Sequence, residues 1–328
     1  MESRQISGTR LISSSIGLGC LGFAGAYGSA DRAQSVLVIR LALDLRVTFL
    51  AVADFYGGGA VEQIVGDAIA DRRDDALIAT QGGLHFTDSG RPTRIDGSPK
   101  YLKQACDASL KRLKVDHVDL YTLSRPDPRV PIEESVGGIA ALVRAGKVRH
   151  VGLRGVSAAT LRRAHAEYPI TAIEGEYSLW ERQVETDLLP MARQLGIGFV
   201  ACSPLGRGFL TGRVTSVHHL AANDARIDDP RFKPESLARN RSMLSRAEEI
   251  AGHHDLGVGR LALAWLLAQG KDIVPVPAAR QLTHLEMNAS AVRVRLTANE
   301  CKELAAVFPV GGVAGADEWR ARRDAALA

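Results

Sequence analysis

The chain has 328 residues, of which 46% are hydrophobic and 24% are charged, a composition typical of a globular protein with one large core. The formal net charge is only +4 and the basic residues are scattered, so we expect no nucleic-acid partner. No apolar run approaches the ~18 residues that cross a bilayer, and we expect a cytoplasmic protein without a membrane partner.

Eight short runs of apolar or β-branched residues recur along the chain, and each predicts a β-strand. These runs are Ser15–Cys20, Val47–Ala53, Ala76–Thr80, Val118–Leu123, His150–Leu153, Thr171–Glu174, Gly198–Cys202 and Asp272–Pro277. Segments with helical periodicity lie between them, namely Asp31–Leu45, Ala60–Ala70, Pro99–Leu113, Ile132–Ala145, Ala158–Glu167 and Val184–Leu195. Ser98 followed by Pro99, and Ser157, are favourable starts for two of these helices.

This alternation predicts an α/β fold, a (β/α)8 TIM barrel formed as one domain over residues 1–328. No GxGxxG motif follows the first strand, which argues against a doubly wound sheet. Residues 3–14 predict a short hairpin at the N-terminal end of the barrel. Residues 205–240 predict an extended loop at the C-terminal face, where the active site of such a barrel lies.

Cysteine and histidine spacing gives no sign of a metal or a disulfide framework. The four cysteines are far apart, without a CxxC motif, which favours a reducing compartment. The pairs His218–His219 and His253–His254 have no third ligand at metal spacing, so no metal is expected.

Several motifs together resemble the aldo/keto reductase family, in particular its bacterial, broad-substrate members. The motifs are Ile16–Cys20, Ala53–Gly57, Ala108–Leu113, Val118–Tyr121, Gly146–Arg149, Glu176–Trp180 and Ser203–Gly208. In that family NADPH transfers hydride to a carbonyl at the barrel mouth and a tyrosine donates the proton. A lysine paired with an aspartate lowers the pKa of the tyrosine, which is otherwise near 10, and a histidine orients the carbonyl.

The resemblance assigns a degenerate catalytic tetrad to this chain. The tyrosine position is Tyr56, but the aspartate, lysine and histidine positions hold Ala51, Gln81 and Ser124. His85, in a loop after the third strand, is a candidate replacement for the missing histidine.

The resemblance also implies an altered nicotinamide site. Arg154, Gly155 and Glu174 stand where the family has Ser, Asn and Gln, and Cys202 replaces the aromatic residue that stacks on the ring. Arg154 and Glu174, on neighbouring strands, are a candidate ion pair.

The adenosine end of the implied cofactor site is better retained. Leu205, Gly206 and Arg207 resemble the loop that wraps the pyrophosphate, while Arg280 and Asn288 remain at the 2′-phosphate and adenine positions. Tyr27, Gln81, His85, Ser124, Trp180 and Cys202 are expected to line the substrate pocket.

Three hypotheses for the function follow. The first is a non-redox lyase or isomerase acting in biosynthesis on a small oxygenated molecule and requiring no cofactor. In it, Tyr56 is the proton donor, Glu174 the base and Arg154 the anion stabiliser. The second is a residual NADP-dependent oxidoreductase of a carbonyl or alcohol. The third is a binding or regulatory protein without catalysis.

Overall fold

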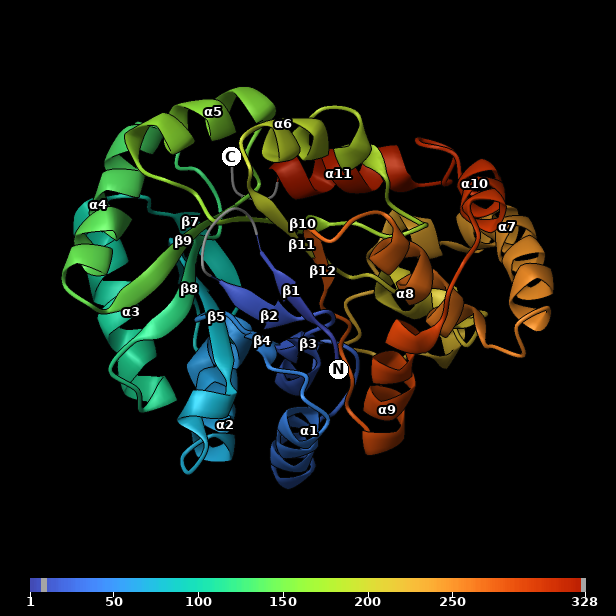
Figure 1. Ribbon diagram of the computed structural model, residues 1–328, viewed down its shortest axis with the longest axis horizontal. Helices are drawn as coiled ribbons and strands as arrows, with labels where there is room; N and C mark the ends of the chain where they lie inside the picture. Colours follow the sequence, from blue (N-terminus) through green and yellow to red (C-terminus); the bar gives the residue numbers. More distant parts are fainter. Residues whose placement is uncertain (7–10, 326–328) are drawn as a thin grey trace.

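Eight parallel strands form the central sheet of this computed structural model, which describes residues 1–6 and 11–325. The strand order is β12-β11-β10-β9-β8-β5-β4-β3. The two outer strands meet through backbone bonds, with the Gly17 nitrogen 2.8 Å from the Pro275 oxygen and the Gly19 nitrogen 3.0 Å from the Pro277 oxygen. A parallel bridge between Gly19 and Ala278 continues this seam. The sheet therefore closes, and the predicted (β/α)8 barrel is confirmed (Figure 1).

The barrel strands are β3 (Leu18–Gly19), β4 (Phe49–Ala51), β5 (Leu77–Gly82), β8 (Val118–Leu123), β9 (Val148–Arg154), β10 (Ala172–Glu176), β11 (Gly198–Cys202) and β12 (Ile273–Pro275). The helices are α1 (Arg32–Asp44), α2 (Ala60–Ala68), α3 (Pro99–Leu113), α4 (Ile132–Arg144), α5 (Ala158–Glu167), α6 (Leu188–Gln194), α7 (Pro234–Gly252), α8 (Val258–Ala268), α9 (Leu282–Ser290), α10 (Ala298–Val307) and α11 (Ala316–Ala325). Figure 1 shows the helices arranged around the strands. Within the described residues, no helix has the length and apolarity that a membrane span requires.

A hairpin covers the N-terminal end of the barrel, as predicted. Strands β1 (Ser3–Gln5) and β2 (Ile12–Ser14) pair antiparallel and lie in front of the barrel in Figure 1. Ile6 and Leu11 belong to a buried cluster with inward-facing residues of the barrel, including Phe49 and Leu120. The hairpin therefore supplies the bottom layer of the barrel interior.

Side chains alternate between the barrel interior and the surrounding helices along each strand. Ala79, Leu120, Ala172 and Val200 belong to the interior cluster, whereas Ile173 packs in the outer core with the helices. Because the period is two, a residue two places beyond an interior residue faces the same side. The alternation therefore directs side chains at the ends of several strands into the C-terminal mouth of the barrel.

Local sequence signals explain where helices begin. The Ser98 side chain accepts a hydrogen bond from the Tyr101 amide, and Ser157 does the same for Thr160. One further hairpin, β6 (Leu84–Phe86) with β7 (Pro92–Ile95), follows β5 and was not predicted.

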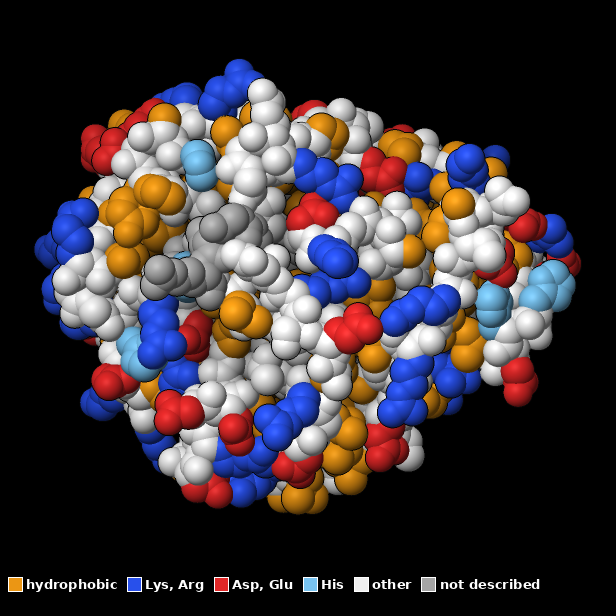
Figure 2. Space-filling view, in the orientation of Figure 1, with side chains coloured by type: hydrophobic (Ala, Val, Ile, Leu, Met, Phe, Trp, Pro, Cys, Tyr) orange, Lys and Arg blue, Asp and Glu red, His pale blue; other side chains and the backbone are white. Residues whose placement is uncertain are grey.

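Charged residues of both signs are intermixed over the face that carries the N-terminal hairpin (Figure 2). Among the residues that the structure describes, that face therefore presents no extended surface of a single sign.

Candidate active site

A hydrogen-bonded network crosses the C-terminal mouth of the barrel. The Gln81 amide nitrogen, at the end of β5, donates to a Glu174 oxygen on β10 at 2.5 Å. These strands are separated in the sheet by β8 and β9, so the bond spans the interior. The Ser124 hydroxyl donates to the Gln81 oxygen at 3.2 Å, and the Cys202 thiol donates to the same Glu174 oxygen at 3.0 Å. The network therefore joins four of the predicted site residues.

Burial makes this network energetically demanding. The exposed fraction is 2% for Gln81, 3% for Ser124 and 5% for Glu174. A carboxylate that is removed from water is costly unless hydrogen bonds replace the lost water. The amide and the thiol supply two such bonds to Glu174.

Arg154 lies opposite Glu174 on the neighbouring strand, because the two residues are register partners in the β9–β10 pair. Among the described residues, the Glu174 carboxylate bonds to Gln81 and Cys202 rather than directly to Arg154. Burial alone would lower the pKa of Arg154, but Glu174, together with Cys202, Tyr56 and Glu176, outweighs it and the net pKa is raised. The arginine therefore remains a cation at the mouth.

Tyr56 follows β4, and the charges of Glu174 and Arg154 both affect its pKa. Its pKa is raised above 10, by burial first and by Glu174 second, whereas Arg154 acts to lower it. Tyr27, in the loop after β3, is close enough to affect the same phenol, and burial raises its own pKa. The structure thus places Tyr56, Arg154, Glu174 and Cys202 in one electrostatic cluster.

Burial also raises the pKa of the Cys202 thiol, and Glu174 adds to the effect. The thiol is therefore held in its neutral form, in which it donates a hydrogen bond and is a poor nucleophile.

Two other predicted pocket residues make different contacts. His85, on β6, has its ring nitrogen 3.0 Å from an Asp96 oxygen and stacks on Tyr101 with ring centroids 4.1 Å apart. Trp180 is 1% exposed and stacks on Phe209 at 4.2 Å, which places it beneath the loop that follows β11.

The predicted pyrophosphate loop begins a tight turn at the mouth. Gly206, Arg207 and Gly208 all have positive φ, at 55°, 54° and 95°. The Leu205 residue is the N-cap of this turn. Among the described residues, the buried Arg207 Nε atom has no hydrogen-bond partner, and it lies 3.6 Å from an Asp229 oxygen, with which it forms an ion pair.

The predicted adenosine residues lie beyond the last strand. The Arg280 guanidinium donates to the carbonyl oxygens of Gly28 and Ser29 at 3.1 and 3.0 Å. Asn288 lies on α9 and is 9% exposed.

A second charged cluster adjoins the mouth and was missed in the sequence. The Arg231 guanidinium, 0% exposed, binds Asp229 and Glu176, each at 2.8 Å. Trp319 of α11 donates its indole N–H to Glu176 at 3.2 Å. Glu176 was identifiable in principle, because it lies two places after Glu174 and must face the same interior. Arg231 and Trp319 gave no comparable local signal.

Glu176 makes part of the stability of this cluster dependent on pH. Burial alone would raise its pKa, but Arg231 and Arg207 outweigh it and lower the pKa from 4.5 to about 2. Because the folded pKa is the lower one, the stabilisation is complete above about pH 4.5 and disappears as the pH falls towards 2.

We therefore expect Glu176→Gln to be less stable than the wild type at neutral pH, with a difference that shrinks on acidification. Urea unfolding of both proteins between pH 7 and pH 3 measures this difference. A difference that stays constant with pH would contradict the assigned ionisation.

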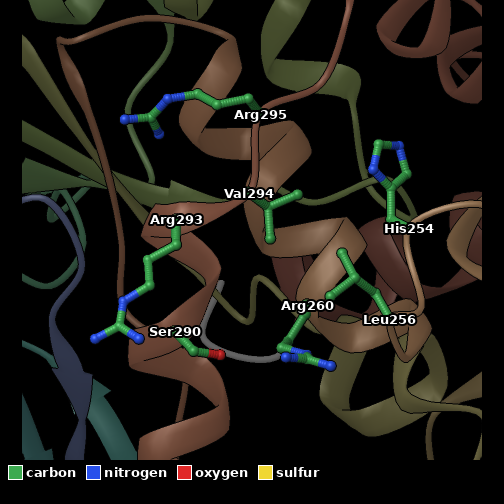
Figure 3. A pocket seen from close by; sticks show the side chains of 7 residues that line it. All are labelled: His254, Leu256, Arg260, Ser290, Arg293, Val294 and Arg295. Carbon is green, nitrogen blue, oxygen red and sulfur yellow. The ribbon is translucent and has the colours of Figure 1, made fainter.

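A hollow of about 380 Å³ lies elsewhere, and none of its lining residues belongs to the mouth. They are His254, Leu256, Arg260, Ser290, Arg293, Val294 and Arg295. Figure 3 shows that the three arginine head groups point in different directions rather than converging on one point. The chemistry at the barrel mouth therefore identifies the candidate active site better than this hollow does.

Comparison with known proteins decides the family. The family model described as "Aldo/keto reductase family" matches residues 15–308. The chain belongs to the aldo/keto reductase family.

Relatives of this aldo/keto reductase extend over nearly the whole chain. A soybean (Glycine max) protein named "Probable aldo-keto reductase 1" is 42% identical over 305 residues, covering 92% of this chain and 87% of the relative. A glycerol dehydrogenase from Gluconobacter oxydans superposes with a TM-score of 0.84 at 28% identity, covering 93% and 94% of the two chains. An aldo/keto reductase from Klebsiella pneumoniae, solved with NADP and acetate, shares the fold at TM-score 0.75 and 24% identity, covering 94% and 96%.

These relatives overturn two predictions for this aldo/keto reductase. The hypothesis of a non-redox lyase or isomerase is wrong, because its family and its 42% identical relative are reductases. The expectation that no cofactor is required is also wrong, because the chain belongs to a reductase family and a 26% identical aldo-keto reductase from Bacillus halodurans, which superposes with a TM-score of 0.77, is solved in its holo form. The error came from treating the substitutions inferred at the tetrad positions as a loss of redox chemistry.

Proposed function

We propose that this protein is an NADP-dependent oxidoreductase that reduces a carbonyl group of a small molecule to an alcohol. One observation carries the proposal. Tyr56, the proton-donating tyrosine that the family resemblance assigns, lies beside Arg154 and Glu174 at the barrel mouth of an aldo/keto reductase chain.

The residues at the nicotinamide end suit a carboxamide, which offers one acceptor oxygen and one donor NH₂ group. Arg154 provides donors, and Glu174 provides an acceptor on the adjacent strand. A charged donor and acceptor therefore take the place of the neutral Ser, Asn and Gln set. The pair would hold the carboxamide from two neighbouring strands.

The residues at the other end suit phosphates. Arg280 supplies a fixed cation for the 2′-phosphate, and Asn288 supplies an amide for the adenine. The unsatisfied Arg207 Nε lies on the loop expected to wrap the pyrophosphate, where a phosphate oxygen would complete its hydrogen bonding.

When bound, the reduced cofactor supplies hydride to the carbonyl carbon. Tyr56 supplies the proton to the carbonyl oxygen, and solvent later restores that proton. The pKa of Tyr56 lies above 10, so the phenol is protonated at neutral pH, as this step requires, and Arg154 offsets part of the rise in pKa that burial and Glu174 cause.

The role of Arg154 differs from that of the family lysine. The Arg154 cation opposes the net rise in the pKa of Tyr56. It therefore stabilises the phenolate that remains after proton transfer. Gln81 occupies the lysine position and holds Glu174 in place instead.

The proposal is tested by fluorescence titration with NADPH. We expect the wild type to bind and Arg280→Ala to bind about tenfold more weakly, because a charge-assisted hydrogen bond to phosphate is lost. NADH, which lacks the 2′-phosphate, should respond much less to the substitution.

Arg246→Ala is the matched control, because this arginine is exposed and pairs with Glu249 and Glu303 away from the mouth. The proposal fails if the wild type shows no binding at millimolar NADPH.

A further inference from the structure

Helix α11 lies beyond the residues that the family model matches and packs against the candidate cofactor loop. The model ends at residue 308, whereas α11 spans Ala316–Ala325. Contacts between α11 and the 310-helix Pro230–Phe232 bring it against the segment that carries Arg231. The helix is therefore an addition to the matched barrel, placed next to its mouth.

Trp319 of α11 reaches Arg207 in the loop after β11. The guanidinium carbon of Arg207 lies 4.0 Å from the centroid of the Trp319 ring, a close cation–π contact. The indole N–H of the same side chain donates to Glu176 at 3.2 Å. One side chain thus bridges the loop after β11 and the end of β10.

The rest of α11 is fixed by buried charges. Arg320 binds Glu181, a residue that is 4% exposed, at 2.9 Å. Gly315 precedes the helix with φ of 81°, and an added Cβ there would lie 2.7 Å from the Pro230 backbone. Because only glycine accommodates both the conformation and this approach, the docked position of α11 depends on Gly315.

Residues 225–226 link the same loop to the loop after β3. Arg226 donates to the Arg207 carbonyl oxygen at 3.2 Å, and its guanidinium lies 5.1 Å from the Tyr27 ring centroid. The Ala225 amide donates to the Ala26 carbonyl at 3.1 Å, across to the loop after β3. A dinucleotide that binds along Arg207 must therefore displace part of this link to enter or leave.

We propose that Trp319 is a positioning residue that holds the cofactor loop through Arg207, so that α11 sets the rate of NADPH exchange. The inference rests on the proposed function. Trp319 fixes the guanidinium whose Nε is unsatisfied, and lifting α11 releases Arg207 and opens the loop.

Stopped-flow fluorescence with NADPH tests this for the full-length protein and its Trp319→Ala and Trp319→Phe variants. We expect Trp319→Ala to raise both the association and the dissociation rate by about tenfold, the size of effect that loss of a partly buried cation–π contact produces. Trp319→Phe retains an aromatic face and should stay close to the wild type. Asp317→Asn is the control, because Asp317 is exposed on the same helix and its ion pair is with Arg320, also on α11.

A second variant separates docking of the helix from contact with Arg207. Gly315→Ala should loosen α11 without altering Trp319, and it should also speed exchange. Trypsin cleavage after Arg320 and Arg322 reports undocking without any cofactor, and it should be faster in Trp319→Ala and Gly315→Ala than in the wild type.

Three results would overturn the inference. Faster trypsin cleavage with unchanged NADPH rates would show that α11 does not control the loop. Unchanged cleavage and unchanged rates would show that Trp319 does not hold α11. Absence of NADPH binding in every variant would overturn the proposed function, and this inference with it.

Discussion

Tyr56→Phe is expected to lower kcat for NADPH-dependent carbonyl reduction by about 10²–10⁴-fold, the usual contribution of a general acid. The phenylalanine ring keeps the packing with Phe55, whose ring centroid lies 5.0 Å from that of Tyr56, but it has no proton to donate. NADPH affinity should change little, because Arg280 and Asn288 are untouched. Steady-state kinetics with a panel of small aldehydes, together with an NADPH titration, measure the two effects separately.

The control is Tyr168→Phe, at the C-terminal end of α5, outside the barrel interior. It should retain the wild-type kcat. If Tyr56→Phe also kept more than half of the wild-type kcat, another group would have to donate the proton, and the assigned role of Tyr56 would be wrong.

Arg231→Met is expected to destabilise the protein by about 3–5 kcal/mol, the cost of breaking a buried ion pair from one side. Arg231 and Asp229 are both 0% exposed, and the guanidinium also binds Glu176. Methionine fills part of the space but leaves two carboxylates without their main partner. Urea unfolding, analysed for the midpoint and the slope, gives the free energy of unfolding.

The matched control for this prediction is Arg246→Met. Arg246 also binds two carboxylates, those of Glu249 and Glu303, but it is half exposed. Surface pairs of this kind contribute about 0–1 kcal/mol, so its loss should be small. Equal destabilisation by the two substitutions would show that burial of the Arg231 cluster adds nothing to the free energy of unfolding.

The fold was predictable because buried parallel strands appear in the sequence as short runs of mostly apolar residues. Gly198–Cys202 is a short run without charged residues and Val118–Leu123 is interrupted by a single charge at Asp119, and both match their strands residue for residue. Pro99–Leu113 was equally clear, because Ser98 and Pro99 mark its start. The hairpin Leu84–Ile95 was missed because β7 is mostly polar and exposed, so it lacks the alternation that identifies a strand.

The site was only partly predictable, for a different reason. The resemblance located the strand ends, and the structure gathers Gln81, Ser124, Glu174 and Cys202 into one network there. Sequence spacing could not show that Glu174 bonds across the barrel to Gln81, because 93 residues separate them. Nor could it bring Trp319 to Arg207, since that contact depends on where a helix beyond the matched barrel docks.

The seam that closes the barrel has a consequence for how the site forms during synthesis of the chain. Gly17 and Gly19 bond to Pro275 and Pro277, which are made about 260 residues after them. Arg280 crosses the same seam to the carbonyls of Gly28 and Ser29. The proposed phosphate end of the site therefore cannot form until the last strand of the barrel has been synthesised.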